Sequence, residues 1–203
     1  MMYDLISELL SNYNFIKKRN SSDWPALNVP SKYLFTFCKI LKNKYNFNIL
    51  ADISGIDLGE NKESRFAVVY QIFSIKRNFY IRIFSLCTDN IKPTIPSLAS
   101  IWSAANWHER EAYDMFGIIF IAHPNLQRIL MWNSYPHHPL RKDFPLAGIN
   151  TNFPSQDIRE NTNAKVEIAP MDGGPFFANS NNCMSKNEPK AYDQSWSESK
   201  QKI

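Results

Sequence analysis

Three runs rich in β-branched and aromatic residues, at 49–53, 66–73 and 79–86, constrain the fold of this chain most strongly. Such runs predict β-strands, and the residues 74–78 between the last two are typical of a hairpin connection. The third run alternates two sets of side chains, which predicts a strand with one face buried under helices. The polar segment 55–64 predicts a longer, flexible link before the second strand.

Helical patterns lie on both sides of these strands. Apolar spacing predicts a short helix around Leu5–Leu10, and a longer helix that Ser31 caps. We expect the stripe of the longer helix to pack in the core; it comprises Tyr33, Leu34, Phe37, Cys38, Leu41 and Tyr45. Residues 26–29 predict a short strand. Ser97 is predicted to cap a helix that runs to Ala105, and residues 107–115 predict another helix that ends at Gly117.

This order of elements predicts an α+β fold, in which helices cover one face of a mixed β-sheet. Repeated X–Pro pairs beyond residue 120 predict an extended Pro-rich segment. The residues after 147 are rich in Asn, Ser, Pro and Gly and cannot build a core of their own. We therefore predict an α+β domain over 1–119, an extended Pro-rich partner-binding segment over 120–148, and a polar C-terminal tail over 149–203 that is irregular or ordered on partners.

Composition excludes several classes of function. The 23 Lys and Arg against 19 Asp and Glu give a net charge of +4, too mild to indicate a nucleic-acid partner. Cys38, Cys87 and Cys183 lie far apart without a CxxC pair, which disfavours iron–sulfur, structural zinc and disulfide frameworks and favours a reducing compartment. The 6 glycines form no dinucleotide or P-loop motif, so we expect no NAD or FMN site. No secretory signal or spanning segment is evident, which indicates a soluble or membrane-peripheral protein.

Charges, prolines and aromatic residues concentrate between residues 107 and 146. Glu109, Glu111 and Asp114 offer carboxylates for acid–base chemistry. Arg110 lies four residues before Asp114, so a helix would pair them and keep Asp114 ionised. We favour a structural interpretation, a salt-bridged helix facing a basic strand that carries Arg128, Arg141 and Lys142.

Two other kinds of site are less well supported. His123, His137, His138 and Cys183 are too scattered to predict a metal centre, and a His before a Pro is more typical of a turn that the ring anchors by hydrogen bonding. The aromatic strand 79–84 invites comparison with a platform on which RNA bases stack. Its alternation is explained more simply by a sheet with one covered face.

Residues 107–118, centred on Glu109–Gly117, resemble the signature of the C subunit of proton-pumping NADH:quinone oxidoreductase, respiratory complex I. Residues 123–130 and 138–145 continue the same signature in order and spacing. Ala122 and His137 stand where members of this family usually have Gly, and Gln127 stands where they usually have Arg. We expect the small Ala122 to be tolerated, and His137 implies that its turn needs no glycine-only conformation.

The resemblance implies a non-catalytic scaffold subunit of the peripheral arm, without flavin, cluster or quinone of its own. In that family the whole complex moves electrons from NADH through FMN and iron–sulfur clusters to quinone, coupled to proton translocation. The expected partners are chiefly the D subunit, with the B and I subunits nearby, and no nucleic acid. The expected location is the cytoplasmic side of a bacterial inner membrane, or alternatively the matrix side of the mitochondrial inner membrane.

We assign no catalytic, cofactor-binding or metal-binding residue, and expect the charged and proline positions of the signature to serve structure or contacts between subunits. These are Glu109, Arg110, Glu111, Asp114, His123, Pro124, Arg128, His138, Pro139, Arg141, Lys142 and Asp143. The last three are expected to form charge-assisted hydrogen bonds across a partner. Two alternatives stay open, a homologous subunit of a related membrane-bound hydrogenase or dehydrogenase, and a stand-alone RNA-binding module.

Overall fold

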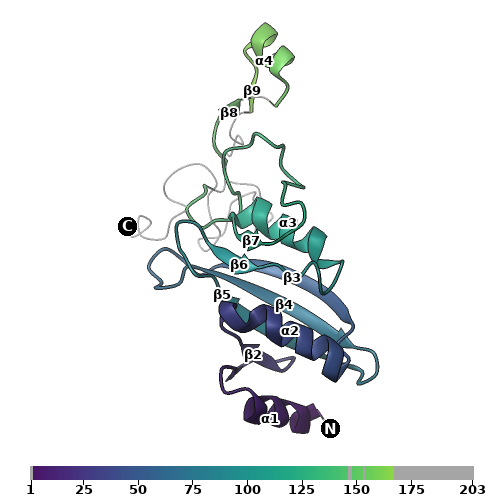
Figure 1. Cartoon of the computed structure of the whole chain (residues 1–203). Helices are drawn as coiled ribbons and strands as arrows, with labels where there is room; N and C mark the ends of the chain where they lie inside the picture. The colour runs from purple at the N-terminus through teal and green to yellow at the C-terminus, as the bar shows by residue number, and fades with distance from the viewer. Residues whose placement is uncertain (1, 146–147, 153, 167–203) are drawn as a thin grey trace, which may run out of the picture. The chain divides into compact units, whose positions relative to one another are not determined.

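The structure, a computed structural model, describes residues 2–145, 148–152 and 154–166 (Figure 1). It divides the chain into two compact units, residues 1–133 and 134–203. The elements of the first unit are α1 (Met2–Asn12), β1 (Lys17–Arg19), β2 (Ala26–Asn28), α2 (Ser31–Tyr45), β3 (Ile49–Asp57), β4 (Phe66–Ser74), β5 (Phe79–Leu86), β6 (Thr94–Pro96), α3 (Ala105–Phe116) and β7 (Ile119–Ile121). Those of the second are β8 (Thr151–Asn152), α4 (Gln156–Thr162) and β9 (Lys165–Val166).

The main sheet has five strands in the order β1-β2-β5-β4-β3. Strand β2 runs parallel to β5, while the other neighbouring pairs are antiparallel, so the sheet is mixed as predicted. Strands β6 and β7 form a separate parallel pair, with α3 as the connection between them. A parallel pair requires such a crossover, because a tight hairpin can join only antiparallel strands.

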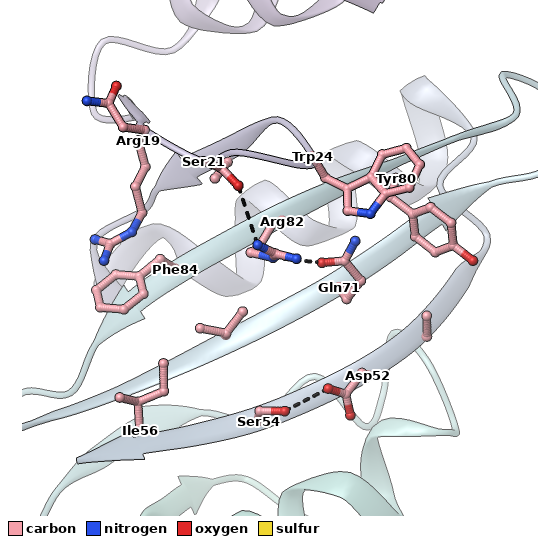
Figure 2. A pocket seen from close by; sticks show the side chains of 14 residues that line it. Arg19, Ser21, Trp24, Asp52, Ser54, Ile56, Gln71, Tyr80, Arg82 and Phe84 are labelled. Atoms are coloured by element: carbon pink, nitrogen blue, oxygen red, sulfur yellow. Dashed lines mark hydrogen bonds between the residues drawn. The ribbon is translucent and has the colours of Figure 1, made fainter. Parts of the chain in front are cut away.

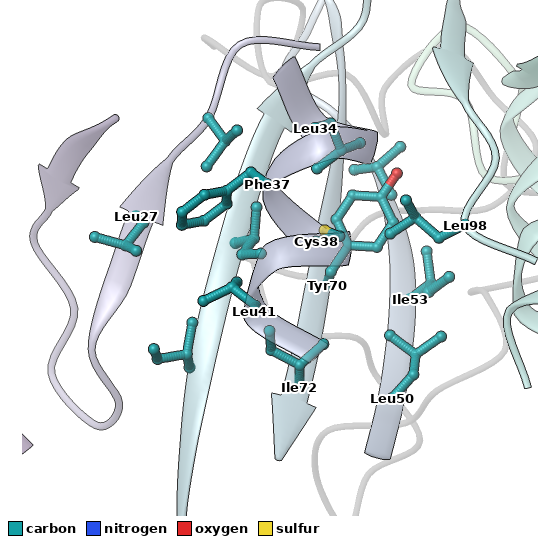
Figure 3. Close-up of a cluster of buried hydrophobic side chains, with 14 of the residues drawn as sticks. Leu27, Leu34, Phe37, Cys38, Leu41, Leu50, Ile53, Tyr70, Ile72 and Leu98 are labelled. Atoms are coloured by element: carbon teal, nitrogen blue, oxygen red, sulfur yellow. The ribbon is translucent and has the colours of Figure 1, made fainter. Parts of the chain in front are cut away.

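Helix α2 packs on one face of the main sheet, where the core lies (Figure 3). Helix α2 points Leu34, Phe37 and Leu41 at the strands, and all three are fully buried. They meet Tyr70 and Ile72 of β4, and each fully buried side chain of this size contributes about 2 kcal/mol to stability. The predicted α+β fold, with helices on one face of a mixed sheet, is therefore confirmed.

The buried thiol of Cys38 also lies on this stripe of α2, and its burial confirms the prediction that it packs in the core. Tyr33 differs from the prediction, because its ring is 37% exposed and stacks on Phe15 with the ring centroids 4.4 Å apart. Cys87 is buried as well, and Cys183 lies outside the described residues.

Three sequence-based predictions about element boundaries are wrong. Strand β3 continues through Asp57, so the polar link begins later than predicted. Helix α2 begins at Ser31 itself, and Pro30 precedes it without a side-chain cap. Residues 97–104 form turns instead of a helix. The Ser97 hydroxyl accepts a hydrogen bond from the Ala99 N–H, so it supports a local turn there.

Helix α3 also approaches the covered face of the sheet at the β3 edge. Gly55 lies beneath Phe116, and a Cβ atom at residue 55 would come within 2.6 Å of the Phe116 ring. A side chain at this strand position would therefore force the Phe116 ring to move. The absence of one lets the C-terminal end of α3 pack directly on β3, which fixes where the charged residues of α3 lie.

Candidate functional site

Helix α3 and the loop that follows β7 carry most of the charged residues of the sequence signature. The helix ends at Gly117, whose φ of 75° is left-handed and whose N–H donates to the Tyr113 carbonyl at 2.8 Å, as predicted for its stop. Strand β7 then pairs with β6, and the chain returns to α3 through residues 123–131. Glu109 and Asp114 of α3 are both fully buried.

The Asp114 carboxylate holds this returning loop. Its Oδ2 accepts hydrogen bonds from three consecutive backbone N–H groups, those of Ile129, Leu130 and Met131, at 2.9, 2.7 and 2.8 Å. Its Oδ1 lies 2.5 Å from a guanidinium nitrogen of Arg128, with which it forms a salt bridge. Burial raises the pKa of Asp114, but these donors together outweigh burial and lower the pKa below its ordinary value.

Arg110 has different partners from those that its spacing predicts. Its guanidinium donates to the carbonyl oxygens of Gln127 and Arg128, each at 3.1 Å, and lies over the Trp107 ring. The predicted pairing with Asp114 is therefore wrong, since Arg128 occupies that carboxylate. The predicted charged state of Asp114 is nevertheless supported by its lowered pKa.

Glu109 lies in a different environment, one turn nearer the start of α3. Its Oε2 accepts from the Ser97 hydroxyl and its Oε1 from the Leu98 N–H, both at 2.6 Å. Burial raises the pKa of Glu109 from its ordinary 4.5 to about 7, and these two hydrogen bonds oppose the change. The hydroxyl of Tyr70, buried without a hydrogen-bond partner among the described residues, has its own pKa raised by burial first and by Glu109 second.

His123 connects the loop to the same helix, and its side chain is fully buried. Its Nδ1 accepts from the Asn125 N–H at 3.0 Å, so the ring proton is on Nε2, which donates to the Asn106 carbonyl at 3.1 Å. Nε2 also lies 3.9 Å from Oε2 of Glu109. The ring thus anchors the turn before Pro124 by hydrogen bonds, as predicted.

Ala122, in the same turn, adopts a φ of 64°. A left-handed backbone costs a residue with a side chain about 1 kcal/mol more than it costs Gly. Ala122 therefore carries an energetic cost that Gly would not, and the expectation that it is tolerated stays a prediction. His137 is absent from the described non-glycine residues with positive φ, which agrees with the expectation for its turn.

The remaining signature residues occupy other places. Glu111 and Pro124 are exposed. His138, Pro139, Arg141, Lys142 and Asp143 belong to the 134–203 unit. There the Arg141 N–H donates to the His138 carbonyl at 3.2 Å, and both residues line a hollow of about 180 Å³ with Asp143. Their expected role at an interface between subunits stays a prediction.

This arrangement favours a structural use of the two buried carboxylates. Glu109 has a pKa suited to proton transfer, but its side chain is fully buried and both carboxylate oxygens accept hydrogen bonds from Ser97 and Leu98. Within residues 2–145, 148–152 and 154–166, no three His, Cys, Asp or Glu side chains group as metal ligands would. In that same part of the chain, no helix has both the length and the apolar character needed to cross a bilayer.

Sequence reasoning did not find several of the groups that complete this site. The Ser97 hydroxyl and the backbone N–H groups of residues 98 and 129–131 hold the carboxylates. A backbone donor leaves no mark in the residue types. The one available signal was the pair of carboxylates on the buried face of a helix, which require partners.

The fold defines the general class of this protein. It is similar to a chain in the membrane-bound sulfane sulfur reductase, an archaeal respiratory membrane complex, with a TM-score of 0.61 and 18% identity over 80% of this chain and 91% of that chain. The chain thus has an α+β fold that also occurs in a respiratory membrane complex.

Residues 27–150 match the model of the family described as respiratory-chain NADH dehydrogenase, 30 kDa subunit, and the chain belongs to that family. It is 43% identical over 122 residues to the second C subunit of the NADH-quinone oxidoreductase of Rhizobium etli. This aligned stretch covers 59% of this chain and 64% of that protein. It is 40% identical over 145 residues to the C subunit of the same enzyme of Moorella thermoacetica, which covers 71% of this chain and 96% of that protein. The predicted resemblance is confirmed.

We expect Asp114→Asn to lower the free energy of unfolding by about 3–5 kcal/mol, because it leaves the guanidinium of Arg128 buried beside a neutral amide. Urea denaturation followed by circular dichroism measures this loss. Asp52→Asn, at an exposed carboxylate, is the matched control and should change stability by less than about 1 kcal/mol. A loss below about 1 kcal/mol for Asp114→Asn would show that the carboxylate does not hold the loop.

The raised pKa of Glu109 predicts that this group stabilises the protein most below pH 4.5, and that the contribution disappears as the pH rises from 4.5 to about 7. A shift of this size corresponds to about 3 kcal/mol. Glu109→Gln should remove this pH dependence from the unfolding free energy measured between about pH 5 and 8. The exposed Glu111→Gln should keep the wild-type slope, and equal slopes for all three proteins would contradict the assignment.

Ala122→Gly should raise the free energy of unfolding by about 1 kcal/mol, since it relieves the left-handed backbone at φ 64°. Ala104→Gly is the control, because Ala104 has a φ of −59° and gains nothing from the change. Thermal unfolding of both variants gives the comparison. An equal or lower stability for Ala122→Gly would rule out strain at this turn.

Proposed function

We propose that this chain is a structural subunit in the peripheral arm of an NADH:quinone oxidoreductase and holds no redox group itself. The complex would move electrons from NADH through FMN and iron–sulfur clusters in partner subunits to quinone, coupled to proton translocation. The observation that carries this proposal is the use of the signature charges. Asp114 pairs with Arg128, and Arg110 and Asp114 bind the backbone of one loop, which supports a scaffolding role over catalysis.

The thiols also support the absence of a cluster in this chain. Cys38 and Cys87 are both buried, and burial raises the pKa of each, that of Cys87 to about 12. Iron and zinc bind the thiolate form, which burial disfavours at both positions. NADH and quinone would then meet this chain only through the complex.

A fused relative supports the D subunit as the main partner. The chain is 43% identical over 133 residues to the combined C/D subunit of the NADH-quinone oxidoreductase of a Sulfurihydrogenibium strain, which covers 64% of this chain and 23% of that protein. A sequence like this one therefore occurs in one polypeptide with the sequence of a D subunit. We infer a permanent interface with the D subunit, with the B and I subunits nearby.

Exposed apolar side chains near the signature provide a surface for such an interface. Trp107, Ile121 and Leu130 are 61%, 55% and 63% exposed. Trp107 lies on α3, Ile121 on β7, which pairs with β6, and Leu130 in the loop that Asp114 holds, so all three lie on ordered elements of the fold. A preorganised apolar surface loses less entropy on association than a mobile one.

The proposed location follows from membership in such a complex. We infer a peripheral position on the cytoplasmic side of a bacterial inner membrane, with the matrix side of the mitochondrial inner membrane as the alternative. The fold similarity to a sulfane sulfur reductase chain supports a second candidate function, a homologous subunit of a related membrane-bound hydrogenase or dehydrogenase. The identity of the co-assembled subunits distinguishes the two.

Affinity purification of the full chain from its native membranes, followed by mass spectrometry, tests the proposal. We expect the D, B and I subunits of NADH:quinone oxidoreductase to co-purify. Hydrogenase subunits in their place would support the second candidate. If the recombinant chain alone carried stoichiometric iron or flavin, or oxidised NADH, the proposed scaffold role would be wrong.

We expect Arg141→Ala to lower the yield of assembled complex severalfold, because charge-assisted hydrogen bonds across an interface between subunits are costly to break. Circular dichroism of the purified full chain should remain unchanged. Native gel electrophoresis of solubilised membranes measures the assembly. If the variant complex formed in normal yield but had lost turnover, Arg141 would have a role other than scaffolding.

A further inference from the structure

The main sheet has a second face, which no helix of residues 2–133 covers. Along each strand, the residues of this face alternate with those that pack under α2, so Asp52 and Gln71 point away from the core that Ile53 and Tyr70 enter. Figure 2 shows this face, with side chains from β1 to β5 lining one hollow of about 800 Å³. We call it the open face.

Aromatic side chains gather at one end of the open face. The ring centroids of Trp24 and Tyr80 are 5.1 Å apart, and those of Tyr80 and Phe73 are 4.5 Å apart. Trp24 is 39% exposed. The solvated face of an antiparallel sheet is usually polar, whereas Trp, Tyr and Arg are the residues that dominate binding at protein interfaces. The composition of the open face therefore indicates a covered surface.

Strand β1 gives one edge of this face a positive charge. Lys17, Lys18 and Arg19 are consecutive and exposed, and β1 is the outermost strand of the sheet. Lys17 and Arg19 lie on the open face opposite Asn28 and Ala26, whereas Lys18 lies opposite Leu27 and points to the other face. None of the three forms a salt bridge with a described carboxylate. The Arg19 guanidinium instead lies 3.8 Å from the centroid of the Phe84 ring and donates to the Asn28 side chain. By contrast, Arg82 in the middle of the face is already paired with Asp23 at 2.8 Å.

These details favour a protein partner over RNA. The Phe84 ring lies under Arg19 and is only 6% exposed, and Tyr80 lies between Trp24 and Phe73, so bases have few free ring faces on which to stack. Asp52, at the opposite edge of the hollow, would repel a phosphate backbone. The unneutralised cations lie together on β1 alone, which suits a short acidic segment.

We propose that the open face is a docking surface for an acidic, amphipathic segment of another subunit. Its apolar side chains lie on Trp24 and Tyr80, and its carboxylates meet Lys17 and Arg19. Each carboxylate supplies the charge-assisted partner that these cations lack among the described residues. This surface is separate from the signature loop, so the proposal rests on the proposed assembly function but does not depend on Arg141.

Site-specific photocrosslinking in the purified complex tests this assignment. Trp24→p-benzoylphenylalanine places the crosslinker on the open face, and Phe35→p-benzoylphenylalanine places it at a similarly exposed position on α2. We expect an adduct at residue 24, at least fivefold above that at residue 35, to a peptide of another subunit with several Asp or Glu residues. An adduct to nucleic acid, to a second copy of this chain or to a peptide without acidic residues would overturn the proposal, as would no adduct above the control.

Charge reversal tests the contribution of β1. With the crosslinker at residue 24, adding Lys17→Glu and Arg19→Glu should lower the adduct yield at least fivefold, whereas Lys32→Glu with Lys39→Glu on α2 should not change it. Raising the salt concentration from about 0.1 to 0.5 M should also lower the adduct yield of the protein without charge reversal. An unchanged yield after reversal on β1 would exclude an acidic segment. If the complex forms in normal yield but gives no adduct at residue 24, the docking proposal is wrong and the proposed assembly function is unaffected.

Discussion

The buried carboxylate of Asp114 organises the part of this molecule that its family shares. A charge inside a protein is tolerated only when it is paired and hydrogen-bonded. Arg128 and three consecutive backbone N–H groups meet that requirement, and in doing so they hold the loop after β7 on helix α3. Arg110 and His123 add independent contacts between the same two segments. The result is a rigid, charge-neutralised support for exposed apolar side chains.

The sequence predicted the fold class because apolar residues recur at the spacing that places them on the buried face of each helix and strand. The stripe of α2 and the alternation in β5 both identified the core face correctly. Boundaries were harder, since Ser97 has the residue type of a helix cap and is used as a carboxylate donor instead. The short strands β6 and β7 went unpredicted, because three residues carry too little pattern to distinguish a strand from a loop.

The sequence identified the residues of the candidate site but only some of the contacts between them. Spacing along a helix made Arg110 the natural partner of Asp114, but a residue fourteen positions later took that place through the fold. Long-range pairs of this kind depend on where a loop returns, which no local pattern encodes. The two carboxylates also diverge in pKa, because Asp114 has four donors around it and Glu109 has two. Burial alone would have raised both values.

Anchoring through peptide N–H groups separates the shape of the loop from the identity of its side chains. Any amino acid except proline supplies the donor that Asp114 needs at positions 129 to 131. The exposed side chain at position 130 can therefore be replaced to suit a different partner surface, while the path of the main chain stays the same. A carboxylate buried in one helix thus makes an adaptable contact compatible with an unvarying architecture.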